Sequence, residues 1–147
     1  MDYCNSILAN IPQKSIQRLQ KLINASVRFI YNLRKREHVS FYAKQTHILP
    51  AAYRIKYKLT TLVHKIINGK APPYLSDLIC PKVIHRSNLR SENDFFMLQQ
   101  QPPSIDIAYK LSSVWNELPY DIRCLSEHDK FKKELKTYIT LWMHIVM

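Results

Sequence analysis

Five basic side chains recur at helical spacing near the amino terminus, and they carry the first chemistry that the sequence suggests. One side of a helix over residues 14–36 would hold Lys14, Arg18, Lys21, Arg28 and Lys35. This stretch contains seven of the 22 Lys and Arg residues and no Asp or Glu. Cations without acidic neighbours neutralise phosphates by releasing counterions, whatever the base sequence. The pattern predicts non-specific contact with an RNA or DNA backbone, with a solvated helix face as the alternative.

Two smaller basic groups follow along the chain. Arg54 and Lys58 form a short stripe on a helix expected over residues 51–68. Arg86 and Arg90 lie in a stretch without helical period, where guanidinium groups can bind phosphate oxygens through paired hydrogen bonds. The alternative for the two loop arginines is that they cap neighbouring helix ends. All four join the predicted nucleic-acid-binding set.

Sites for metals and cofactors are not indicated. Cys80 and His85 stand close in sequence, but no second close pair completes the four ligands that zinc needs. The single glycine, Gly69, excludes phosphate-binding loops, dinucleotide fingerprints and hydrolase nucleophile elbows, since these need several glycines or a glycine at a fixed place. The sequence therefore predicts no metal, no cofactor, no small-molecule substrate and no catalysis.

Composition indicates one domain inside the cell. The chain has 147 residues, 46% of them hydrophobic, and a net charge of +11. Its three cysteines are odd in number and widely spaced, unlike a secreted disulfide framework, and its first residues lack the pattern of a signal peptide. The longest nearly apolar stretch, residues 138–147, is shorter than the roughly 20 residues that span a bilayer. We expect a nuclear or cytoplasmic protein without a membrane partner.

Hydrophobic periodicity predicts an all-α fold, an orthogonally packed helical bundle with one long irregular loop. Residues 1–12 would be the truncated end of an upstream helix, and 13–147 a single domain. Helices are expected at 14–36, 51–68, 106–117 and 127–145, the loop at 81–104, and a short strand near 95–98. The buried face of the first helix is expected to comprise Ile16, Leu19, Leu22, Ile23, Ser26, Val27, Ile30 and Leu33.

Aromatic residues give a further expectation. Tyr53, Tyr57 and Tyr109 could stack on the bases of a single strand, but packing in the core or at its rim is the preferred interpretation. Trp115 lies on the apolar side of a helix that ends near Pro119 and is expected to be structural.

Read in order, a series of short motifs along the chain resembles the carboxyl-terminal region of the reverse transcriptase of non-LTR (LINE-type, jockey-like) retrotransposons. The similarity runs from residue 2 to about residue 140. Its motifs are Asp2-Tyr3-Cys4-Asn5-Ser6, Leu19-Gln20 with Asn24-Ala25 and Arg28, Leu49-Pro50 with Tyr53-Arg54-Ile55, Asn68-Gly69 with Ala71-Pro72, Tyr74-Leu75 and Asp77-Leu78, Arg86-Ser87 with Leu89-Arg90-Ser91, Trp115-Asn116 with Leu118-Pro119 and Ile122-Arg123, and Phe131-Lys132 with Leu135-Lys136.

The resemblance implies a piece of an RNA-directed DNA polymerase without its chemistry. The family's catalytic Asp-Asp pair lies in the upstream palm, and this chain has no Asp-Asp. The represented region is thought to help hold template RNA and target DNA. Four positions depart from the family pattern: Ile23 stands for Gln, Ser26 for Ala, Ile48 for Trp and Ile107 for Arg.

Two functions remain as alternatives at this point. The first is a non-catalytic fragment that binds RNA or DNA non-specifically through its basic helix. The second is a protein-interaction module, or a non-functional relic, whose apolar helix face packs on missing palm and thumb domains. Membrane binding by the basic helix would need that apolar face to be free.

Overall fold

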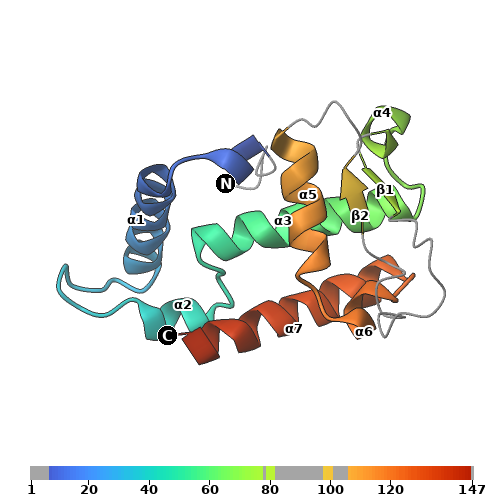
Figure 1. Cartoon of the computed structure of the whole chain (residues 1–147). Helices are drawn as coiled ribbons and strands as arrows, with labels where there is room; N and C mark the ends of the chain where they lie inside the picture. Colours follow the sequence, from blue (N-terminus) through green and yellow to red (C-terminus); the bar gives the residue numbers. More distant parts are fainter. Residues whose placement is uncertain (1–6, 78, 82–97, 101–105, 147) are drawn as a thin grey trace.

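The protein is mainly helical, as its periodicity predicts. The computed structural model describes residues 7–77, 79–81, 98–100 and 106–146 (Figure 1). Its elements, in order, are η1 (Ile7–Asn10), α1 (Gln13–Ile30), α2 (Ser40–Gln45), α3 (Ala51–Ile67), α4 (Pro73–Ser76), β1 (Ile79–Pro81), β2 (Leu98–Gln100), α5 (Asp106–Asn116), α6 (Tyr120–Arg123) and α7 (His128–Val146). In Figure 1, α7 runs alongside α3, α5 crosses it, and α1 stands beyond the amino-terminal end of α3.

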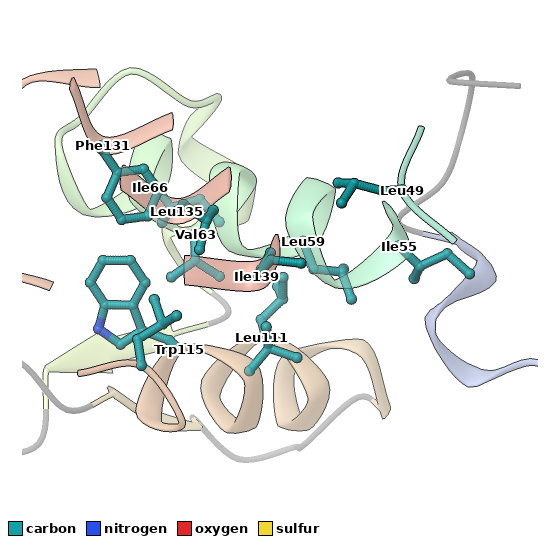
Figure 2. Close-up of a cluster of buried hydrophobic side chains, with 12 residues drawn as sticks. Leu49, Ile55, Leu59, Val63, Ile66, Leu111, Trp115, Phe131, Leu135 and Ile139 are labelled. Atoms are coloured by element: carbon teal, nitrogen blue, oxygen red, sulfur yellow. The ribbon is translucent and has the colours of Figure 1, made fainter. Parts of the chain in front are cut away.

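Helix α3 is the centre of the fold, because it contacts α1, α5 and α7. Apolar residues at helical spacing face these neighbours, and Leu59 and Val63 are buried against Leu111 of α5 and Phe131 of α7 (Figure 2). Trp115 closes the same cluster, so its predicted structural role is confirmed. The core therefore belongs to α3, α5 and α7.

The first helix is shorter than predicted. It ends at Ile30 rather than residue 36, because Asn32 adopts a left-handed φ of 50°. The Asn32 N–H donates to the Phe29 carbonyl (3.4 Å) and the Leu33 N–H to the Arg28 carbonyl (3.0 Å). These are the two bonds of a Schellman motif, which satisfies the last carbonyls of a helix. Leu33 therefore lies beyond the helix.

The same ending closes two more helices. His47 after α2 and Gly69 after α3 have φ of 53° and 65°. The Lys70 N–H donates to the Lys65 carbonyl (2.8 Å), completing the motif at Gly69. The predicted helix over 51–68 is thus confirmed to within one residue.

The predicted loop over 81–104 contains part of a small sheet. Strands β1 and β2 pair antiparallel, with Cys80 opposite Gln99. The predicted strand near 95–98 overlaps β2 only at Leu98, and residues 95–97 lie outside the described residues. Pairing partners so far apart in sequence leave no local period, which explains why the boundaries were misplaced.

The carboxyl-terminal helices match expectation closely. Helix α5 covers residues 106–116 and α7 covers 128–146, against predictions of 106–117 and 127–145. The short α6, which starts directly after Pro119, was not predicted. At the other end, η1 contacts α3 and α5, and Leu8 packs against the core.

Candidate nucleic-acid interface

The outer side of α1 carries three exposed cations. Lys14, Arg18 and Lys21 follow one another at i, i+4 and i+7, so their side chains leave the same side of the helix. Between residues 7 and 77 the described chain contains two acids, Glu37 and Asp77, and neither is on α1. The α1 stripe, defined as Lys14, Arg18 and Lys21, is thus positively charged without a carboxylate on its own helix.

The other two members of the predicted stripe are placed differently. Lys35 is exposed, but it lies in the turn after α1 because the helix ends early. Arg28 is half-buried: its Nη2 donates to the Glu37 carbonyl (3.3 Å), and its Nε is buried without a hydrogen-bond partner among the described residues. The five residues therefore do not form one continuous stripe, because the chain after Ile30 folds back onto Arg28.

Arg28 lines a cavity of about 550 Å³ between α1, α2 and the segment that connects them. Other basic residues on its wall are Arg36 and Lys44. We call this cavity the α1–α2 pocket. Residue spacing alone does not reveal this pocket, because it forms only when residues 36–50 pack against α1.

Two further predicted residues lie on α3 rather than on α1. Arg54 and Lys58 are half-buried on α3, and each interacts with other groups of the chain. Arg86 and Arg90 lie outside the described residues.

Large apolar side chains on α1 are exposed, contrary to the prediction for this helix. Leu22 is 55% exposed, Ile30 63% and Phe29 88%, whereas Ile23 and Val27 are buried. Helix α1 packs against α2 and α3, and the side chains that it buries are Ile23 and Val27. At about 100° per residue, Phe29 lies on the same side of α1 as Arg18 and Leu22. The exposed ring of Phe29 therefore lies on the side of α1 that carries the α1 stripe, about two turns beyond Lys21.

The three tyrosines considered for base stacking differ in their exposure to solvent. Tyr53 and Tyr57 are half-buried against the core, as preferred from the sequence, whereas Tyr109 is exposed on α5. Phe29 is the better stacking candidate because it neighbours the α1 stripe, and sequence reasoning missed it since it falls outside the regular apolar face.

A pair of histidines forms a second polar cluster, inside the core. His64 is buried, and its ring stacks on Phe131 with centroids 4.0 Å apart. Its Nε2 lies 2.8 Å from the Leu125 carbonyl, and its Nδ1 lies 3.1 Å from His128 Nδ1. Since a carbonyl only accepts, His64 Nε2 carries the proton, and neutral His64 must accept at Nδ1 from His128 Nδ1–H.

This arrangement favours neutral rings. Protonation of His64 at Nδ1 would break this bond unless His128 moved its proton from Nδ1 to Nε2, which is buried without a hydrogen-bond partner among the described residues. Burial is the main cause that lowers the pKa of His64. The hydrogen bond to the Leu125 carbonyl raises this pKa, and the charge of Lys70 lowers it further. Burial also lowers the pKa of His128, helped by Lys132, His64 and Lys65 and opposed by Asp129. The pair is structural. No sequence motif predicts it, because its two histidines are 64 residues apart.

In the described part of the chain, no three His, Cys, Asp or Glu side chains converge as metal ligands would. Among the same residues, no helix is both long enough and apolar enough to cross a membrane.

Comparison with protein-family models, curated proteins and solved structures gives no match.

Proposed function

We propose that the chain binds RNA or DNA through the α1 stripe, without base specificity and without catalysis. The observation that carries the proposal is the set of three exposed cations on one side of a helix that has no acid. Such a surface gains affinity by releasing counterions from phosphates. Phe29 beside it favours strands with unpaired bases, because any base can stack on an aromatic ring.

The resemblance to the end of LINE-type reverse transcriptases supports the same proposal. In that setting the chain is a non-catalytic carboxyl-terminal fragment of an RNA-directed DNA polymerase, and the α1 stripe helps to hold template or target strand. RNA and DNA remain alternatives, which one competition experiment between matched oligonucleotides separates.

A salt titration with a labelled oligonucleotide tests the proposal. Three phosphate contacts predict a log-log slope of about −2 on a single strand and about −2.7 on a duplex. The triple substitution Lys14→Glu, Arg18→Glu and Lys21→Glu should abolish binding at physiological salt.

The matched control is Lys130→Glu, Lys133→Glu and Lys136→Glu on α7, where all three lysines are exposed. This control makes the same change in net charge away from α1, so it should weaken binding only slightly. Equal loss in both triple variants, or no binding by the wild-type chain at low salt, would reject the α1 stripe as the site.

A second candidate function rests on the exposed Leu22, Phe29 and Ile30. A protein surface that covers these side chains, such as an upstream polymerase domain, would gain from burying them. The double substitution Leu22→Gln and Ile30→Gln distinguishes protein docking from nucleic-acid binding. If α1 is a docking surface, the change should reduce self-association and dye binding while leaving oligonucleotide binding intact. Unchanged self-association would argue against docking.

A further inference from the structure

The α1–α2 pocket presents an unusual excess of hydrogen-bond donors. Arg28 offers a buried Nε without a partner among the described residues, and Arg36 and Lys44 add two positive charges to the wall. The one acid on the wall is Glu37, whose backbone carbonyl accepts from Arg28 Nη2. The guanidinium of Arg28, together with Arg36 and Lys44, makes the wall positively charged, and guanidinium groups donate charge-assisted hydrogen bonds to anionic oxygens.

The orientation of Asn24 adds to this donor set. The Ala51 N–H donates to Gln20 Oε1 (2.8 Å), which fixes the Gln20 amide, and Gln20 Nε2 must then donate to Asn24 Oδ1 (2.8 Å). Asn24 lines the pocket, and because its Oδ1 accepts from Gln20, its Nδ2 can donate to a ligand. The polar side of the pocket is therefore arranged for an acceptor with several oxygens.

The opposite side is apolar. Ile23 and Val39 are buried, and both line the pocket together with Ile48 and Ala43. The cavity volume of about 550 Å³ is much larger than an inorganic phosphate requires and falls within the usual range for small-molecule sites. A ligand that fills it needs a charged end and a larger body with an apolar face.

We propose that the α1–α2 pocket binds a phosphate monoester of about the size of a nucleoside monophosphate, with the phosphate on Arg28, Arg36 and Asn24 and the body on Ile23 and Val39. The ligand is either a free nucleotide or the phosphorylated end of a strand. This site is distinct from the α1 stripe and does not depend on strand binding there.

Calorimetric titration with AMP tests the pocket. AMP should bind more tightly than adenosine, which lacks the phosphate, and more tightly than inorganic phosphate, which lacks the body. The adjacent pair Arg36 and Lys35 provides matched variants, because both are exposed cations of the same turn but only Arg36 lines the pocket. Arg36→Gln should weaken AMP binding about tenfold, the loss of one charge-assisted hydrogen bond, while Lys35→Gln leaves it unchanged.

Arg28→Gln provides a second test, and a thermal melt checks that this variant folds. Where it does not fold, the result for Arg36→Gln decides. Absence of AMP binding at millimolar concentration, or equal weakening by Lys35→Gln and Arg36→Gln, overturns the proposal.

The source of the ligand is resolved in the Lys14→Glu, Arg18→Glu, Lys21→Glu background, where strand binding by the α1 stripe is removed. Preference for a 5′-phosphorylated over a 5′-hydroxyl oligonucleotide assigns the pocket to strand ends, and AMP binding without that preference assigns it to a free nucleotide. If AMP binds this variant normally, the pocket stands even where strand binding fails.

Discussion

Helix α1 and the helices of the core are both amphipathic, yet they use their apolar faces differently. The core helices bury theirs on each other, with Val63, Leu111 and Phe131 fully enclosed. Helix α1 buries only Ile23 and Val27 and leaves Phe29 in solvent. Periodicity states which side of a helix can be buried, but the neighbours decide how much of that side is covered.

The charges of the two regions differ in the same way. Residues 7–77 carry thirteen Lys and Arg against two acids, whereas residues 106–146 carry six of each. Balanced charges on α5–α7 surround a core that provides stability. The excess positive charge of residues 7–77 is spread mainly over α1, the turn after it, α2 and α3, and on α1 it lies on the exposed Lys14, Arg18 and Lys21, where an anionic partner can reach it.

The largest expected effect on the free energy of unfolding comes from comparing alanine substitutions of one buried and one exposed aromatic residue. Trp115→Ala removes a buried ring from the core and should lower the free energy of unfolding by about 3–5 kcal/mol. Phe29→Ala should change it by less than about 0.5 kcal/mol, since the ring is already in solvent. Urea denaturation of both variants measures this. A large cost at Phe29 would mean that α1 packs more extensively than its exposure indicates.

The histidine pair predicts that acid weakens the core. The pKa of His64 and that of His128 are lowered from 6.5 by burial, so the unfolded chain binds more protons just below that value. The stabilisation by the neutral pair is complete above pH 6.5 and is lost as the pH falls from there through the folded-state pKa values. His128→Gln should flatten the dependence of the unfolding free energy on pH in this range, whereas the exposed His38→Gln should not. An identical slope in the two variants would exclude the pair as the cause.

Glu117 also makes stability depend on pH, but in a more acidic range than the histidine pair. Burial raises the pKa of Glu117, but the hydrogen bond and charge of Lys56, with Ser113 and Lys110, together outweigh it and leave the pKa below 4.5. The contribution of Glu117 is therefore present above pH 4.5 and is lost only as the pH falls below it.

The smallest expected effect concerns helix endings. Gly69→Ala places a Cβ at a φ of 65°, where nothing lies within 4 Å, so the cost is conformational strain of about 1 kcal/mol without a clash. Asn32→Gly at the end of α1 should change stability by no more than about 0.5 kcal/mol, because Asn already tolerates this conformation. Thermal melts of the two variants measure the difference. A larger effect at Asn32 than at Gly69 would reverse the ranking.

These endings also show what the sequence could predict. Gly69 marked the end of α3 because glycine is the usual residue there. Asn32 and His47 perform the same task, but both residue types also occur inside helices, so the first helix was drawn too long. Features that depend on distant partners were missed for a different reason. Arg28 reaches the Glu37 carbonyl, and Leu98 pairs with Pro81, only after the chain has folded.

The bond between Gln20 and Ala51 has a consequence for motion. Because α1 buries only Ile23 and Val27, it can detach from the core at a lower free-energy cost than α3, which buries eight residues. Gln20 spans this weak boundary, since it supplies an acceptor to the otherwise unpaired first amide of α3. Detachment of α1 would break that bond and open the α1–α2 pocket at once. A ligand held in the pocket would therefore stabilise the attachment of α1 to the rest of the fold.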